Sequence, residues 1–141
     1  MHWNINPGIG CGDIQFGMTR TEVRKALPFP FKPFRKSLNS TIETDAYFKM
    51  TVHICYSSEY LVEAIEFNTG SNPVFNGKII MGVPLRDVVQ FLQGSENKID
   101  VSDDGFIDLT HGISGYAPGS SKDSGKSIIQ SVLVFKKGYY S

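Results

Sequence analysis

The chain has 141 residues, of which 40% are hydrophobic, and its 14 basic and 14 acidic side chains give a formal net charge of zero. This length and composition are typical of one globular domain, so we expect a single domain over residues 1–141. A neutral chain has no overall attraction to nucleic acid or anionic membranes, and no apolar run approaches the ~18 residues of a membrane span. We therefore expect neither nucleic acid nor a membrane as partner.

The first segment, residues 2–12, is rich in Gly and Pro and predicts a flexible entry to the fold. It lacks the basic and apolar regions of a secretory signal, so we expect a cytoplasmic location. Cys11 and Cys55 are the two cysteines. In a reducing compartment we expect them to be free, buried thiols rather than a disulfide.

A helix is predicted directly after a short strand at Asp13–Phe16. Thr19 is a favourable N-cap, and Glu22 stands at the third helical position of a capping box. The helix should end near Leu27, because a Pro-rich segment, Pro28–Phe34, follows and favours extended backbone.

The clearest strand signal is Tyr47–Tyr56, where apolar residues alternate with others. This alternation predicts one apolar face toward the core, made of Phe48, Met50, Val52, Ile54 and Tyr56. A polar turn separates it from a second strand at Leu61–Asn68. The two strands are therefore predicted to form an antiparallel hairpin.

The second half of the chain begins with a predicted strand at Phe75–Met81. Pro84 then favours the first turn of a helix that reaches Leu92. A hairpin is predicted from Lys98–Val101 and Phe106–Leu109, because Asp-Gly between them is a strong turn signal. A long polar loop, Gly112–Gly125, should precede a buried strand at Ile128–Phe135.

An internal repeat organises these elements. Ile14–Leu27 aligns without gaps to Ile79–Leu92, with identical Ile, Gly, Val and Leu at four matched positions. The repeat predicts two strand–helix–meander units over about residues 13–68 and 75–135. We therefore expect an α+β fold in which an antiparallel sheet carries two short helices on one face. The other face would be open to a partner.

Three motifs resemble chemical sites but fail on spacing or context. Gly119–Ser127 (GSSKDSGKS) lacks the glycine spacing of a phosphate loop and is followed by a strand rather than a helix. His53 and Cys55 share a strand face and could form a thiol–imidazole pair, although no orienting group is evident. Cys and His spacings do not match a zinc site. We expect no cofactor, no metal and no enzymatic activity.

Acidic residues gather in the two predicted hairpins and are the candidate binding residues. They are Asp100, Asp103, Asp104 and Asp108 in one hairpin, and Glu59, Glu63 and Glu66 in the other. Basic residues collect elsewhere, at Lys32, Arg35, Lys36, Lys136 and Lys137. These acids could simply form the solvent-exposed rim of the two hairpins. The separation of acidic from basic residues in a neutral chain instead favours recognition of a basic protein partner.

The repeat motif resembles a known family. The Gly-Met-Thr-x-x-Glu-Val-x-x-x-Leu of Gly17–Leu27, and more weakly Gly82–Leu92, is similar to the SmpA/BamE and β-lactamase-inhibitor-like families. This resemblance implies a helical segment packed on an antiparallel sheet, in two tandem copies. A member of this group without a secretory signal, as expected for this chain, is similar to the immunity proteins of bacterial contact-dependent inhibition systems. Each of those proteins blocks one cognate toxin domain, commonly a nuclease.

Three functional hypotheses remain at this point. The first is a cytoplasmic immunity protein that occludes the active site of a basic, nuclease-like toxin domain through its acidic hairpins. The second is a small-ligand-binding or housekeeping module with a pocket between helices and sheet, lined by Phe29, Phe31 and Tyr56. The third is an enzyme that uses His53 or His111.

Overall fold

The computed structural model describes residues 2–94 and 99–140, which form an α+β fold with two short helices. In the first half, the elements are β1 (Trp3–Asn6), β2 (Gly10–Cys11), β3 (Ile14–Gln15), α1 (Arg20–Ala26), β4 (Lys32–Arg35), β5 (Glu43–Tyr47), β6 (Val52–Tyr56) and β7 (Val62–Asn68). In the second half, they are β8 (Pro73–Phe75), β9 (Lys78–Ile79), α2 (Leu85–Leu92), β10 (Ile99–Val101), β11 (Gly105–Asp108), β12 (Ile113–Tyr116) and β13 (Ser131–Phe135).

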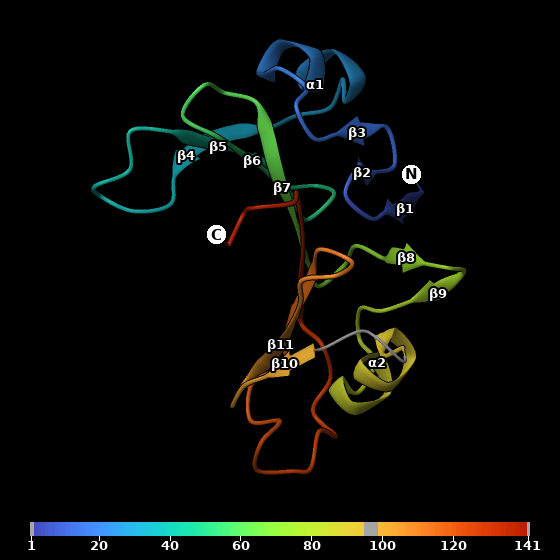
Figure 1. The fold of residues 1–141 in the computed structure, drawn as a ribbon. Helices are drawn as coiled ribbons and strands as arrows, with labels where there is room; N and C mark the ends of the chain where they lie inside the picture. The colour runs from blue at the N-terminus through green and yellow to red at the C-terminus, as the bar shows by residue number, and fades with distance from the viewer. Residues whose placement is uncertain (1, 95–98, 141) are drawn as a thin grey trace.

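The strands form two sheets instead of the single predicted sheet (Figure 1). The large sheet has eight antiparallel strands in the order β10-β11-β12-β13-β7-β6-β5-β4. The small sheet has the order β3-β2-β1-β8-β9, and its β1 and β8 pair in parallel. The prediction of one sheet is therefore wrong, because the N-terminal segment expected to be flexible supplies two strands, β1 and β2, of a second layer.

The strand order of the large sheet is symmetric about its central pair, β7 and β13. Each meander runs from an edge of the sheet, β4 or β10, inward to a central strand, β7 or β13, and Glu66 lies directly opposite Leu133. Matching hydrogen bonds join the start of each helix to the neighbouring meander. The N–H of Gly17 donates to the carbonyl of Val62, and the N–H of Gly82 donates to that of Ile129, each at 2.9 Å.

Both helices begin where the sequence predicts. Thr19 caps α1 through a complete capping box with Glu22, while α2 follows Pro84 and has no side-chain cap. The first amides of α2 instead donate to the carbonyls of Ser127 and Gly125 (2.9 and 3.0 Å). The loop 117–127 therefore closes the start of α2 in the way that side chains close the start of α1.

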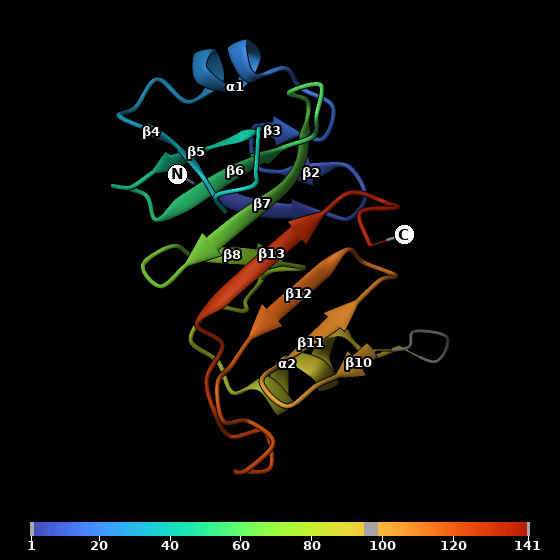
Figure 2. The same ribbon diagram turned by 90° about the vertical axis from the view of Figure 1, so that its left-hand side faces the viewer.

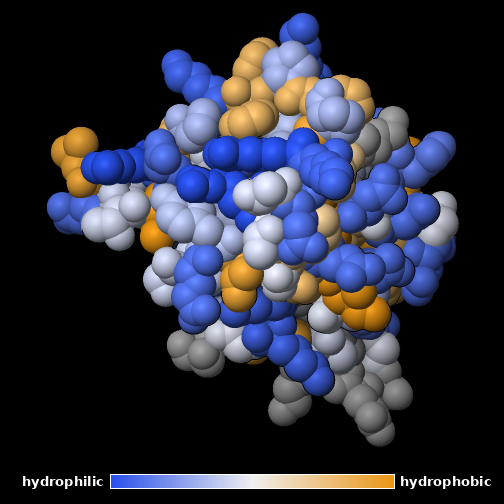
Figure 3. Space-filling view, turned by 90° about the horizontal axis from the view of Figure 1, so that it is seen from above, coloured by the Kyte–Doolittle hydropathy of each residue, from blue (hydrophilic) through white to orange (hydrophobic). Residues whose placement is uncertain are grey.

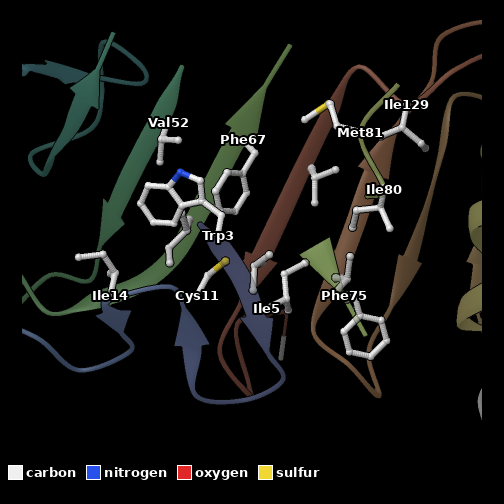
Figure 4. Packing of buried hydrophobic residues seen from close by; sticks show 14 of the residues in the cluster. Trp3, Ile5, Cys11, Ile14, Val52, Phe67, Phe75, Ile80, Met81 and Ile129 are labelled. Carbon is white, nitrogen blue, oxygen red and sulfur yellow. The ribbon is translucent and has the colours of Figure 1, made fainter. Parts of the chain in front are cut away.

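The core lies between the two sheets (Figure 4). Trp3 of the small sheet meets Phe67 of the large sheet edge-on, with ring centroids 5.3 Å apart. Buried side chains of both helices, including Val23 and Leu92, belong to the same hydrophobic cluster. Cys11 is fully buried there, which raises the pKa of its thiol to about 12. Each large apolar side chain buried in this way contributes about 1.5–3 kcal/mol.

The opposite face of the large sheet is left open. Figure 2 shows this face toward the viewer, with α2 and the small sheet behind it and α1 at its upper end. The C-terminal residues fold back over one part, where Tyr139 stacks on Phe135 near Cys55. At the α1 end, by contrast, hydrophilic and scattered hydrophobic residues mix (Figure 3). We call this open face of the large sheet, on the side away from the small sheet, the free face.

Several predicted elements have different bounds. The predicted strand Tyr47–Tyr56 contains the end of β5, a turn and β6, so Phe48 is exposed and Tyr47 is buried. The predicted strand Phe75–Met81 is a hairpin that turns at Asn76 and Gly77. The predicted loop Gly112–Gly125 contains β12. The β6–β7 and β10–β11 hairpins are confirmed, although Lys98 lies outside the described residues.

Candidate functional site

One row of directly paired residues crosses the free face from edge to edge. In strand order it comprises Lys32, Ala46, His53, Glu66, Leu133, Ser114, Ile107 and Asp100. Directly opposite residues have Cβ atoms about 4.5–5.5 Å apart, so each side chain can contact the next one along the row. The row is basic at β4, has apolar Leu133 and Ile107 on the two sides of Ser114, and is acidic at β10.

A hollow of ≈ 300 Å³ opens on the free face over β11, β12, β13 and β7. Ile107 and Leu133 form its apolar floor, with Ser114 between them. Its remaining lining is Glu66, Ser102, Asp104, Gly105, Phe106, Gly115, Tyr116 and Ser131. The fold thus brings two predicted acids, Glu66 and Asp104, from different hairpins to opposite sides of one hollow. Asp100 stands beside its floor, because it pairs with Ile107.

Glu66 is held as a carboxylate by its neighbours. His53 Nδ1 lies 3.0 Å from Glu66 Oε1, and Lys36 Nζ lies 3.5 Å from Oε2. The hydrogen bond from His53, assisted by the charge of Lys36, lowers the pKa of Glu66 to about 2 despite its partial burial. Glu66 therefore stays ionised at neutral pH, with its charge partly compensated.

The β10–β11 hairpin presents three further predicted acids. Asp100, Asp103 and Asp104 are exposed. The loop that follows β12 fixes the turn, since the carbonyl of Asp104 accepts from Ala117 N–H (2.6 Å) and that of Asp103 accepts from Ser121 N–H (3.1 Å). The hairpin is thus a fixed acidic projection at the edge of the free face.

The other predicted acids lie elsewhere. Asp108 faces the interior with a fully buried side chain, 2.7 Å from Nδ1 of His111, so it does not belong to the exposed acidic surface. Alternation explains this correction, because Ile107 points to the free face and its neighbour Asp108 must point inward. Glu59 is exposed in the β6–β7 turn, and Glu63 lies beside Lys136, at the other end of β7 from the hollow.

A buried polar network escaped the sequence analysis. Arg24 on α1 donates two hydrogen bonds to Asp45 (3.0 and 2.9 Å), and Tyr56 donates a third (2.8 Å). Asp45 is fully buried. Burial and the Asp45 carboxylate raise the pKa of Tyr56. This network ties α1 to the large sheet, and no spacing rule connects Arg24 to Asp45 in the sequence.

The structure also gives the surroundings of the two alternative sites, the His53–Cys55 pair and the predicted aromatic pocket. Burial raises the pKa of Cys55, which disfavours its nucleophilic thiolate, while the neighbouring His53 bonds Glu66. Phe29, Phe31 and Tyr56 each have different contacts. Phe29 borders a hollow with Trp3 and Met50, Phe31 packs on Tyr47, and Tyr56 bonds Asp45.

Within residues 2–94 and 99–140, no three His, Cys, Asp or Glu side chains are grouped so that they could hold a metal ion. In the same part of the chain, no helix has the length and hydrophobicity needed to cross a membrane. Comparison with protein-family models, curated proteins and solved structures finds no match to this chain.

Proposed function

We propose that this chain is an immunity protein that binds a cognate bacterial toxin domain in the cytoplasm and neutralises it by occluding its active site. The observation that carries the proposal is the hollow on the free face, which joins an apolar floor at Ile107 and Leu133 to carboxylates at Glu66 and Asp104. A flat sheet face with an apolar centre and a charged rim has the composition of a protein interface.

Charge complementarity favours a basic partner such as a nuclease, whose active site must attract nucleic-acid phosphates. Exposed Asp100, Asp103 and Asp104 would steer such a domain toward the β10–β11 edge. A Lys or Arg side chain of the partner could then lie along the apolar floor with its cationic end at Glu66 or Asp104. The free face would thereby cover the groove that the toxin needs for its substrate.

The same proposal includes the duplicated architecture. The symmetric strand order, the matched hydrogen bonds at Gly17 and Gly82, and the Glu66–Leu133 pair support two copies of one unit over residues 13–68 and 75–135. The acceptors Val62 and Ile129 lie 67 positions apart (129 − 62), as do Glu66 and Leu133 (133 − 66), so equivalent residues of the two copies pair at the centre. A two-fold relation between the copies requires such a pairing. The resemblance to SmpA/BamE and β-lactamase-inhibitor-like proteins belongs to this unit.

The test uses the C-terminal domain of the protein encoded immediately upstream of this chain. Co-expression of the chain should restore growth to cells that produce that domain, and the two purified proteins should form a complex. Replacing Ser114 with Arg, which fills the hollow, or Ile107 and Leu133 together with Lys should abolish both results. Hot-spot substitutions of this kind commonly weaken binding by 2 kcal/mol or more, about 30-fold in Kd.

Ile79→Lys is the matched control, because Ile79 is an exposed apolar residue on β9, away from the free face. It should protect cells as well as the unaltered chain does. Thermal unfolding of every variant separates lost binding from lost folding. An upstream domain that is not toxic, or equal protection by folded free-face variants, would overturn the proposal.

A further inference from the structure

A second hollow, of ≈ 550 Å³, lies between α2, the end of β10 and the loop that follows β12. Its lining consists of Leu85, Arg86, Val89, Gln90, Gln93, Val101, Ser102, Asp103, Ser120, Ser121, Ser124 and Gly125. This volume falls in the range of small-molecule sites. It is separate from the hollow on the free face, and only Ser102 lines both.

The hollow has a fixed frame. On one side, the amides of Leu85 and Arg86 hold the loop to α2. On the other, the hydroxyl of Ser120 and the amide of Ser121 donate to the carbonyl of Asp103 (3.3 and 3.1 Å). Gly125 allows the loop to lie close against α2, since a Cβ at this position would lie 2.9 Å from Cβ of Arg86. The loop therefore bridges helix and hairpin rather than closing over the space between them.

Comparison with α1 explains why the space is open. In the aligned motifs, Val89 occupies the position of Arg24. Arg24 extends to Asp45 and lies over the ring of Phe31 (4.5 Å from its centroid). Val89 is too short to reach the large sheet in this way, so the corresponding volume beside α2 remains unfilled.

The chemistry of the lining indicates a ligand with an apolar body and two opposite charges. Leu85, Val89 and Val101 offer apolar surface, whereas Arg86 and Asp103 offer a guanidinium and a carboxylate. Serine hydroxyls supply further donors and acceptors. We propose that this hollow binds an apolar α-amino acid, with its carboxylate at Arg86, its ammonium group at Asp103 and its side chain on Val89. This inference does not depend on the proposed function.

The probes are L-leucine and L-phenylalanine, titrated into the whole chain and followed by amide NMR shifts. Saturable shifts confined to α2, residues 101–103 and residues 120–125 are expected. The matched compounds 4-methylpentanoate and 3-methylbutylamine each lack one charged group of leucine. Each should bind at least about 10-fold more weakly, because the acid makes no charged contact to Asp103 and the amine makes none to Arg86, whose Nε lies 3.8 Å from Oδ1 of exposed Asp87.

Two variants test the residues directly. Arg86→Gln should weaken leucine binding about 10-fold, whereas Val89→Arg, which places the residue of the α1 half in the hollow, should abolish it. Lys25→Gln, an equivalent charge removal on α1, should change nothing. Absence of saturable shifts up to about 10 mM probe, or equal binding of leucine and both analogues, would overturn the site. Either result would leave the toxin-binding test on the free face unaffected.

Discussion

The two edges of the large sheet occupy corresponding places but carry opposite charge. The β4 edge presents Lys32 and Arg35, and the β10 edge presents Asp100 and Asp103. Lys32 on β4 and Asp100 on β10 are the two ends of the same row across the free face. The strands β4 and β10 lie toward opposite corners of Figure 2. Eight strands spaced about 4.8 Å apart separate these edges by roughly 34 Å, several Debye lengths at physiological salt. A net charge of zero thus conceals two independent patches.

The two helices differ in a related way. α1 is tied to the sheet by the buried Arg24–Asp45–Tyr56 network, whereas α2 packs through apolar residues and borders an open hollow. The contact between helix and large sheet is therefore polar and filled at α1, but apolar and partly open at α2. We therefore expect binding to occur where the second half departs from the first, at the acidic edge and beside α2.

The largest expected effect comes from the polar network. Arg24→Met keeps most of the side-chain volume but leaves the Asp45 carboxylate buried without its cation. We expect the free energy of unfolding to fall by about 3–5 kcal/mol, measured by urea denaturation. Val89→Met, at the aligned position of α2, should cost less than about 1.5 kcal/mol. Similar losses for the two variants would remove the contrast between the halves.

The two tyrosines beside Asp45 should respond in opposite directions. Tyr56→Phe removes a hydrogen bond to a charged group and should cost about 1.5–3 kcal/mol of stability. The buried hydroxyl of Tyr47 has no hydrogen-bond partner among the described residues. Tyr47→Phe should therefore be neutral or raise stability by about 1 kcal/mol. A clear loss in Tyr47→Phe would show that this hydroxyl contributes to the network.

Acid should act on the centre of the free face through Glu66. Its pKa in the folded chain, about 2, is below its ordinary value of 4.5, so its ionised form stabilises the fold above pH 4.5. That contribution, on the order of 1–3 kcal/mol, is lost as the pH falls from about 5 to about 2. Glu66→Gln should remove this part of the acid dependence in chemical denaturation. Leu133→Gln, on the opposite strand, should retain it, and an unchanged acid limb in Glu66→Gln would contradict the assignment.

Local signals in the sequence predicted the elements that have clear boundaries. The capping box at Thr19, the Pro at the start of α2 and the Asp-Gly turn of the β10–β11 hairpin all correspond to observed features. The missed turn between β5 and β6 has no Gly, Pro or Asn. Within this turn Thr51 adopts a left-handed backbone conformation, with φ 55°. The alternation of apolar residues continues through the turn and conceals it.

Other features depend on contacts that no local pattern contains. β12 escaped prediction because one of its inward positions is Gly115, where a Cβ would lie 2.5 Å from the ring of Phe106. The predicted acids were correctly grouped by hairpin. Only the register showed that Asp108 is buried and that Glu66 and Asp104 share a hollow.

The association rate of the upstream-encoded domain, the proposed toxin, distinguishes the two edges of the large sheet. Stopped-flow measurements would compare the unaltered chain with Asp100→Lys/Asp103→Lys and with Lys32→Glu/Arg35→Glu, which reverse equal charge at the two edges. Reversal of the acidic edge should slow association at low salt by about 10-fold or more and reduce its salt dependence. Reversal of the basic edge should leave the rate within about twofold. Equal rates for all three chains, or a larger loss from the basic edge, would contradict this prediction.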